Sequence, residues 1–342
     1  MSKVGSLDLS RDPRPGSAPS RHPAGSGAHP APAAERMAVA VINWNTRELL
    51  RRCLATIMAE HPSEVVVVDN GSSDGSIAMV RDEFPAVRLQ VLPENPGYGA
   101  ASNIAFTLCA AEYVLLLNSD TELRAGALEA LVAHLDRCPR AGIVGPRLLN
   151  PDGSLQKSTF PDPGPLVPLV KRRPIADLVR AVPPLRDAFV GEWAHDRERR
   201  VPWVLGAALA IRRAAFEKVA GFDESFVMYY EEVDLCYRLR KAGWEIHFTP
   251  ATEVTHIGGA STSQRRPEML ARLGLSEVDF HRRHHRGLER AVAVGLVRAA
   301  VRYRLVRDWL GYRMSRGEAK RRVFAENLAV WREVLARSSR PV

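Results

Sequence analysis

Long hydrophobic runs are absent from this sequence of 342 residues, which argues against a membrane-spanning protein. The longest apolar stretches, 201–211 and 291–297, fall well short of the ~20 residues that cross a bilayer. The N-terminus has no charged segment followed by an apolar stretch, so we recognise no secretory signal. We therefore expect a cytoplasmic protein.

Cysteine is also scarce, and its spacing offers no paired motif. Cys53, Cys109, Cys138 and Cys236 lie far apart, without any Cys-x-x-Cys pair. Buried reduced thiols are the expected state of these residues, while a disulfide or a zinc site is the alternative.

Two common phosphate-binding loops are missing. The first predicted strand is not followed by Gly-x-Gly-x-x-Gly, and Gly-x-x-x-x-Gly-Lys-Ser/Thr occurs nowhere. A nucleotide could still bind if a metal ion handled its phosphates.

Positive charge is confined to the C-terminal part of the chain. Residues 265–342 hold 19 Lys and Arg against 8 Asp and Glu, whereas residues 1–264 hold 29 against 31. A nucleic-acid enzyme is expected to carry positive charge around its working cleft. The slightly acidic motif-rich part therefore argues against a nucleic-acid partner.

Composition and periodicity divide the chain into three parts. Residues 1–36 are rich in Pro, Gly, Ser and Ala without hydrophobic periodicity, which predicts a disordered leader. Residues 37–264 are predicted to form the catalytic domain, including a proline-rich, mobile connector over 161–202 with one helix near 175–182. Residues 265–342 are predicted to form a basic helical extension.

Short β-rich runs alternate with helical stretches from residue 37 onward. The first four predicted strands span 38–42, 64–68, 87–92 and 113–117, with helices over 47–60, 76–83, 100–110 and 125–137. Further along the chain, 203–211 and 244–248 are predicted strands, and 231–242 is a predicted helix that ends before Gly243. Such alternation predicts an α/β fold with a mostly parallel central sheet flanked by helices. Ligands of such sheets gather at the carboxyl ends of the strands.

Polar residues follow each of the first four predicted strands. The loops that carry them are 43–45, 69–75, 95–99 and 118–120. One such loop would be explained by turns and helix caps, but four together favour a polar site. Asp120 directly follows the fourth strand, where its carboxylate can bridge Mg²⁺ or Mn²⁺ to a diphosphate.

A series of motifs resembles one enzyme family over residues 37–264. The matching stretches, in the family's order, are 41–45, 67–76, 95–99, 117–120 and 230–235, followed by His256. They resemble the family 2 glycosyltransferases of the GT-A fold, particularly rhamnosyltransferase-like members that build bacterial surface polysaccharides.

The resemblance implies a metal-dependent inverting glycosyltransferase. The donor would be a nucleotide diphosphate sugar, with deoxythymidine diphosphate rhamnose favoured and uridine diphosphate hexoses open. The acceptor would be a hydroxyl group of a glycan or a polyprenyl-linked glycan.

The resemblance also implies roles for individual residues on the donor side. It places Asn43 and Asn45 in the nucleotide pocket and Asp69 on the pyrimidine base. It places Asn95, Gly97 and Asn103 near the donor sugar and phosphates, where a helix N-terminus suits an anion.

The metal assignment follows from the same resemblance. Asp120 corresponds to the last residue of the family's Asp-x-Asp element and would bind Mg²⁺ or Mn²⁺ together with His256. Asn118 departs from the first Asp of that element, so we expect it at the ribose or in an outer shell. A packed or solvated histidine is the alternative for His256.

Inversion by a single displacement needs a base that deprotonates the acceptor, and Glu232 is the candidate. Glu231 and Trp203 are expected at the acceptor. The alternative is that the acidic residues only favour a helix N-terminus, that Asp234 forms an i,i+4 pair with Arg238, and that Trp203 packs in the core.

The basic extension contains a helix with two apolar stripes. The first comprises Val292, Leu296, Ala299, Tyr303, Val306 and Leu310, and the second comprises Val294, Val297, Val301 and Leu305. Packing on both sides against the catalytic domain or another subunit is one interpretation. Peripheral contact with the anionic inner face of a cell membrane is the other.

Two other functions remain open at this point. A noncatalytic nucleotide-sugar or carbohydrate-binding protein could use the same scaffold, and a nucleic-acid-binding protein could use the basic extension. Neither accounts for the acidic pair Glu231 and Glu232 together with His256.

Overall fold

A computed structural model describes residues 33–165, 167, 175–182, 184, 193–258 and 266–339. Most of the predicted leader and much of the predicted connector lie outside these residues. Within the connector, helix α6 (Ile175–Ala181) forms where the sequence predicted it.

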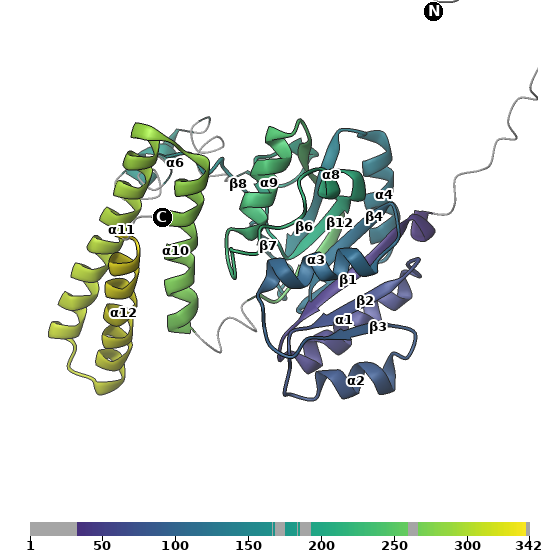
Figure 1. The fold of residues 1–342 in the computed structure, drawn as a ribbon, viewed down its shortest axis with the longest axis horizontal. Helices are drawn as coiled ribbons and strands as arrows, with labels where there is room; N and C mark the ends of the chain where they lie inside the picture. Colours follow the sequence, from purple (N-terminus) through teal and green to yellow (C-terminus); the bar gives the residue numbers. More distant parts are fainter. Residues whose placement is uncertain are drawn as a thin grey trace, which may run out of the picture. The chain divides into compact units, whose positions relative to one another are not determined.

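Four parallel strands form one half of the central sheet, as predicted (Figure 1). Their order is β3-β2-β1-β4, with bounds β1 (Met37–Asn43), β2 (Val65–Asp69), β3 (Arg88–Val91) and β4 (Tyr113–Asn118). The connecting helices are α1 (Arg47–Ala59), α2 (Ser76–Glu83) and α3 (Tyr98–Leu108). Every residue of β1 and β2 is buried, as expected of strands covered on both faces.

Alternate residues of β1 pack into two separate cores. Val39 and Val41 contribute to the core that holds Leu54 of α1, whereas Ala38 and Ala40 contribute to the core that holds Phe106 of α3. The two-residue period of a strand therefore supplies both helical layers of the α/β fold.

The other half of the sheet is mixed. Strand β11 (Ala208–Arg212) runs antiparallel to both β4 and β6 (Ala141–Leu149). Strand β12 (Glu245–His256) is parallel to β6 and antiparallel to β5 (Thr121–Leu123). The smaller strands are β7 (Leu155–Gln156), β8 (Thr159–Phe160), β9 (Arg199–Arg200) and β10 (Trp203–Val204).

Two strand predictions need correction. The run 203–211 is not one strand, because 205–207 form a turn between β10 and β11. The strand predicted over 244–248 continues to His256 as β12. Its pairing with β6 shifts register between Thr249 and Glu253, around Pro250, which is how a strand accommodates a residue without an N–H donor.

The remaining helices of this part cover the sheet. They are α4 (Ala127–Arg137), α8 (Arg213–Lys218) and α9 (Glu231–Lys241). The predicted helix ending before Gly243 is confirmed by α9, and Gly243 takes a left-handed φ of 91°.

The extension forms three helices, α10 (Arg266–His284), α11 (Gly287–Met314) and α12 (Glu318–Arg337). Val301, Trp331 and Val334 belong to their shared core. Helix α10 also packs on α9, where His284 Nε2 lies 2.6 Å from Asp234 Oδ1 and Phe280 is fully buried. The extension is thus continuous with the rest of the unit 31–342.

The two stripes of α11 have different environments. Val297 and Val301 of the second stripe are buried, and Val301 packs against α10 and α12 of the extension itself rather than against the catalytic domain. Tyr303, Val306 and Leu310 of the first stripe are 64%, 53% and 46% exposed in the single chain, so packing of this stripe against another subunit stays a prediction. No helix among the described residues is long and apolar enough to cross a membrane.

The described residues begin before the predicted end of the leader. Ala33–Arg36 form a 3-10 helix, and the Arg36 guanidinium donates to Glu112 Oε2 and Asp136 Oδ2, each at 2.7 Å. The same group lies 5.2 Å from the centre of the Tyr113 ring.

We expect Arg36→Ala to lower the free energy of unfolding by about 1 kcal/mol, since its partly exposed partners keep the ion pairs weak. Urea unfolding measures the change. Arg52→Ala is the matched control, because Arg52 is 55% exposed and pairs with Glu122 at 3.3 Å. Equal losses in the two variants would contradict a special role for Arg36.

Candidate active site

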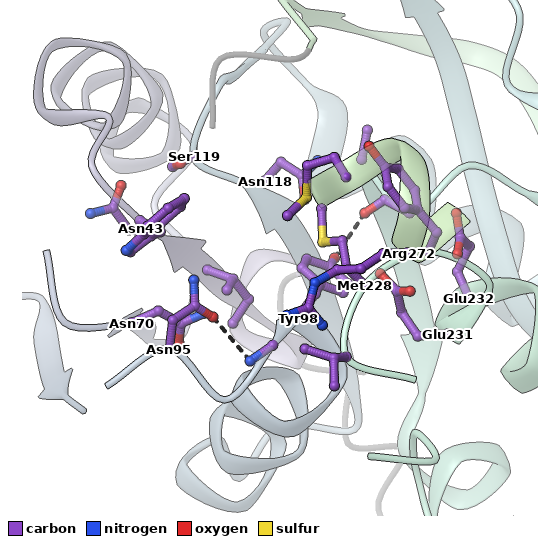
Figure 2. A pocket seen from close by; sticks show the side chains of 18 of the residues that line it. Asn43, Asn70, Asn95, Tyr98, Asn118, Ser119, Met228, Glu231, Glu232 and Arg272 are labelled. Atoms are coloured by element: carbon purple, nitrogen blue, oxygen red, sulfur yellow. Dashed lines mark hydrogen bonds between the residues drawn. The ribbon is translucent and has the colours of Figure 1, made fainter. Parts of the chain in front are cut away.

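A cavity of about 590 Å³ lies where the four predicted loops converge (Figure 2). Loops after β1, β2 and β4, the start of α3, the first turn of α9 and helix α10 all line it. The lining includes Asn43, Asn70, Asn95, Gly97, Asn118, Asp120, Glu231, Glu232, His256 and Arg272. The prediction that ligands gather at the strand ends therefore matches the position of this cavity.

Strand pairing brings Asp120 and His256 together. His256 pairs with Thr121 across β12 and β5, so its ring lies beside the preceding residue, Asp120. His256 Nε2 is 3.4 Å from Asp120 Oδ1, and both side chains are about 10% exposed.

Gln156 orients the His256 ring. Its Nε2 donates to Asn150 Oδ1 and to the carbonyl of His256, which leaves Gln156 Oε1 to accept from His256 Nδ1–H at 2.7 Å. The Nε2 lone pair therefore faces Asp120. A carboxylate oxygen and an oriented imidazole nitrogen are a donor set that fits a divalent metal ion.

The acidic pair occupies the first turn of α9. The two residues before it, Tyr229 and Tyr230, both adopt left-handed φ values, 66° and 69°. Non-glycine residues in this region are strained, and such strain is concentrated at functional sites. The turn directs both glutamates to the cavity.

Burial raises the pKa of the Glu232 carboxyl. Burial, then the charge of Glu232, raises the pKa of Glu231 well above its ordinary value. Among the described residues, the Oε2 atom of each is buried without a hydrogen-bond partner. Such carboxyls are suited to proton transfer nearer neutral pH than an ordinary glutamate.

Several predicted ligand residues instead form hydrogen bonds within the protein that hold the loops around the cavity in place. Asp69 is fully buried, and its carboxylate accepts from Asn43 Nδ2 and from the Ser72 amide, both at 2.7 Å. Asn43 lines the cavity, but its Oδ1 accepts from Thr46 at 2.7 Å. Asp69 has no exposed surface, so this placement does not support its predicted contact with the base.

Asn45 and Asn103 also connect structural elements. Asn45 Oδ1 accepts from the Ser73 amide at 2.8 Å, which ties the loop after β1 to the loop after β2. Asn103 bonds to both the carbonyl and the amide of Phe222, joining α3 to the segment before α9. Neither is among the residues that line the cavity.

Trp203 and Asp234 follow their structural alternatives. Trp203 stacks on Phe160 with ring centres 4.4 Å apart and donates to the Pro161 carbonyl, and it is not part of the cavity lining. Asp234 Oδ2 lies 2.7 Å from Arg238 Nε, as an i,i+4 pair. The predicted acceptor contact of Trp203 is therefore not supported.

Residues 32–274 match the family model described as glycosyltransferase like family 2. The chain belongs to glycosyltransferase family 2. The resemblance of its motifs to this family is thereby confirmed, and the protein is a glycosyltransferase.

This family 2 enzyme is similar to two named rhamnosyltransferases. It is 32% identical over 299 residues to N-acetylglucosaminyl-diphospho-decaprenol L-rhamnosyltransferase of Mycobacterium tuberculosis, covering 83% of this chain and 95% of that protein. Rhamnosyltransferase WbbL of Escherichia coli K12 is 41% identical over 56 residues, which cover 16% of this chain and 21% of that protein.

A solved structure supports the fold. The mannosyltransferase PcManGT from Pyrobaculum calidifontis, in complex with GDP-Man and Mn²⁺, has a TM-score of 0.50 at 16% identity. The match covers 89% of this chain and 86% of that one. The family 2 enzyme therefore has the predicted GT-A fold.

The sequence analysis missed residues that the extension contributes to this glycosyltransferase site. Glu268, Met269 and Arg272 of α10 line the cavity, although the catalytic domain was predicted to end at residue 264. The spacing of Glu268 and Arg272, which pair at 2.9 Å, is visible in the sequence as an i,i+4 pair. That signal predicts a helix but not what the helix covers.

Two backbone amides at the start of α3, where an anion site was predicted, have acceptors within the protein, and the rest of that prediction is untested. The Gly97 amide donates to Asn95 Oδ1 at 3.0 Å, and the Tyr98 amide donates to the Val227 carbonyl at 3.3 Å. These two amides therefore have internal acceptors. Gly97 itself has a φ of 104°, and an added Cβ would lie 2.3 Å from the Val227 oxygen.

We expect Gly97→Ala to lower the free energy of unfolding by about 3 kcal/mol or more, because backbone strain and a backbone clash add together. Gly126→Ala is the matched control, since Gly126 has a φ of 78° but open space around its Cβ position. It should lose only about 1 kcal/mol. Chemical denaturation compares them, and equal losses would show that the Val227 contact is unimportant.

Proposed function

We propose that the enzyme transfers rhamnose, with inversion, from deoxythymidine diphosphate rhamnose to a hydroxyl of a polyprenyl-linked glycan in cell-envelope polysaccharide synthesis. The similarity to two rhamnosyltransferases supports the sugar, and the decaprenol-linked acceptor of one of them supports a lipid-linked acceptor. The observation that carries the proposal is that Asp120 and Glu232, distant in sequence, line one cavity.

Asp120 and His256 would hold Mg²⁺ or Mn²⁺ at the donor diphosphate. When bound, the ion supplies positive charge that stabilises the departing diphosphate. Arg272 lies at the same cavity and would add a guanidinium suited to phosphate oxygens. Asn118 would contact the donor ribose or the outer shell of the ion.

Asn70 is a better candidate than Asp69 for recognising the pyrimidine. Its Oδ1 is buried and has no hydrogen-bond partner among the described residues, while its Nδ2 donates to Asn95 Oδ1 at 3.3 Å. An unpaired buried acceptor costs free energy that a donor on a ligand can recover. The imide N–H that thymine and uracil share would supply that donor.

Glu232 would remove the proton of the acceptor hydroxyl as its oxygen attacks the anomeric carbon and the bond to the diphosphate breaks. The neighbouring Glu231, also at the cavity, would orient the acceptor through hydrogen bonds to its other hydroxyls. Attack from the face opposite the leaving group gives inversion in one displacement.

The exposed residues of the first stripe of α11 would place the enzyme on an anionic membrane, where a polyprenyl-linked acceptor resides. Tyr303, Val306 and Leu310 are exposed apolar groups on one face of the helix. Arg302 and Arg313, both exposed, lie beside that face. Apolar insertion flanked by basic residues is the usual basis of peripheral binding to anionic lipid.

Glu232→Gln should lower the turnover number at least about 10²-fold, because it removes the base but keeps the shape. Nucleotide release in the presence of donor and acceptor measures it, and calorimetry should find donor affinity nearly unchanged. Glu217→Gln, on the surface helix α8, is the control. Near-normal turnover in the Glu232 variant would exclude it as the base.

The pH dependence should reflect the raised pKa of Glu232. A base must be ionised, so kcat/KM should fall as pH decreases through a value above the ordinary glutamate range.

The same raised pKa of Glu232 means that the folded state binds this proton more tightly than the unfolded chain does. The carboxyl's contribution to stability is thus lost as pH rises through the folded-state value.

Asp120→Ala should abolish the metal dependence of donor binding, since it removes the carboxylate that would hold the ion. Calorimetric titration of the donor with and without Mn²⁺ tests this. Asp152→Ala, in an exposed turn, should retain the metal dependence. Full activity of the unaltered enzyme in excess chelator would remove the metal from the mechanism.

The double variant Tyr303→Glu and Val306→Glu should bind anionic vesicles about tenfold or more weakly, because two apolar groups no longer enter the lipid. Co-sedimentation with phosphatidylglycerol vesicles at low salt measures binding. Val323→Glu, at a 42% exposed position on α12, is the control. No binding by the unaltered protein would exclude the membrane contact.

A further inference from the structure

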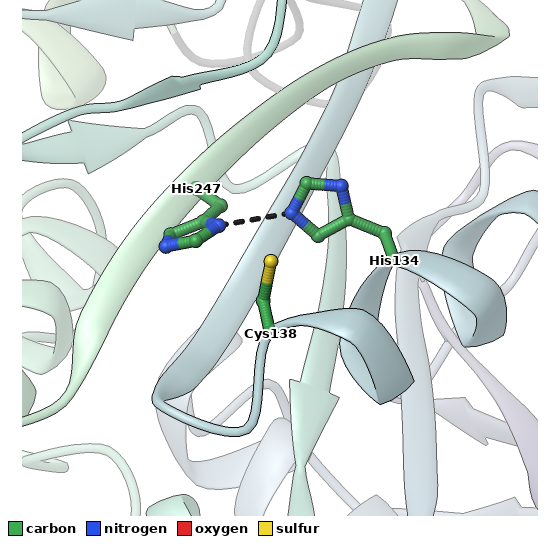
Figure 3. A group of neighbouring side chains, drawn as sticks. All are labelled: His134, Cys138 and His247. Carbon is green, nitrogen blue, oxygen red and sulfur yellow. Dashed lines mark hydrogen bonds between the residues drawn. The ribbon is translucent and has the colours of Figure 1, made fainter.

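A second group of metal-ligating side chains lies away from the cavity, near the beginning of β12, the strand that ends at His256. His134 of α4, Cys138 at the end of α4 and His247 of β12 place their ligand atoms within 4.8 Å of one another (Figure 3). His247 pairs with Val144 and Thr255 pairs with Leu149, five residues further along β6, so at 3.3 Å per residue His247 and His256 lie about 20 Å apart. The group is therefore distinct from the donor site.

Local structure accounts for this convergence. His134 and Cys138 are four residues apart, so they share one face of α4. Strand β12 runs next to β6, which begins at Ala141, directly after the loop that follows α4. His247 thereby faces the end of that helix.

A carboxylate contacts one nitrogen of each imidazole ring, on the side away from the other ring. Glu198 Oε1 lies 3.1 Å from His134 Nδ1, and Glu245 Oε2 lies 3.0 Å from His247 Nε2. The two remaining nitrogens, His134 Nε2 and His247 Nδ1, face each other at 2.9 Å. Carboxylates that orient the outer nitrogens are what histidine ligands of metal ions normally have.

The hydrogen atoms available do not fill this chain of contacts. A hydrogen bond needs one N–H proton at each of the three contacts Glu198–His134, His134–His247 and Glu245–His247. Two neutral imidazole rings carry only two such protons, so one contact is left without a proton. With a metal ion between the rings, His134 donates to Glu198 and His247 donates to Glu245. Both facing lone pairs then have a partner.

Arginines already balance the two carboxylates. Arg137 lies 2.8 Å from Glu198, and Arg200 lies 2.9 Å from Glu245. Neither carboxylate therefore requires a charged imidazole as its counterion. Neutral imidazoles are the form that binds metal.

We propose that His134 Nε2, His247 Nδ1 and the Cys138 thiolate bind Zn²⁺, with water as the fourth ligand. Two nitrogens and one thiolate suit this ion, and the thiol releases its proton to solvent on binding. Tetrahedral bonds of about 2.0–2.1 Å place the nitrogens about 3.3 Å apart, so the rings separate slightly. The ion would tie α4 to β12 and act as a structural site.

Cys138 differs from the other thiols of the chain. Burial raises the pKa of Cys53, Cys109 and Cys236 to about 12, and all three are enclosed in the core. Cys138 is half-buried and lies beside two histidines. It therefore departs from the expectation of an isolated core thiol, and Cys109→Ser serves as a control substitution.

The test uses the full chain, freed of metal by a chelator and titrated with Co²⁺. We expect saturation of one site per chain with a thiolate-to-cobalt charge-transfer band in the near ultraviolet, and its loss when Zn²⁺ is added. Cys138→Ser, which is nearly isosteric, should lose the band. Cys109→Ser and Asp120→Ala should keep it, which separates this site from the donor site.

A second measurement addresses the supporting carboxylates. Glu245→Gln should weaken Co²⁺ binding about 10- to 100-fold without abolishing the band. Zn²⁺ should also raise the melting temperature of the unaltered protein but not that of His247→Ala. A missing band, or a band that persists in Cys138→Ser, would reduce the group to a hydrogen-bonded chain and overturn the proposal.

Discussion

The pairing of β12 with β5 and β6 is the interaction on which the rest of the molecule's chemistry depends. It brings His256 against Asp120 at one end of the strand and His247 against α4 at the other. The register shift around Pro250 allows one strand to serve both ends. A one-residue change in register would turn the histidines to the opposite face, so the pairing is strictly constrained.

Beneath the cavity, a buried polar network holds the loops in place. Asp69 and Asn43 bond to each other, and Thr46 links Asn43 to Ser119, whose hydroxyl lies 2.6 Å away. In a low-dielectric interior such bonds are strong, and an unpaired member is costly. The network therefore sets the positions of the neighbouring residues that line the cavity.

The extension completes the site and links it to the proposed membrane contact. Helix α10 lines the cavity with Arg272 and packs on α9 through Phe280 and His284. Helix α11 packs against α10 and α12 with its second stripe and exposes Tyr303, Val306 and Leu310 of its first stripe. An enzyme that takes a soluble donor and a lipid-linked acceptor benefits from having both surfaces on connected helices.

Periodicity and motif order in the sequence determined the α/β class, the strand ends that form the cavity, and the family. Residue type alone did not separate Asn70, which lines the cavity, from Asp69, the last residue of β2, which is fully buried, because both are polar side chains at the same strand end. Only the tertiary structure decided that α10 covers the site and that His134, Cys138 and His247 meet. Those contacts join residues distant along the chain, and local spacing carries no information about them.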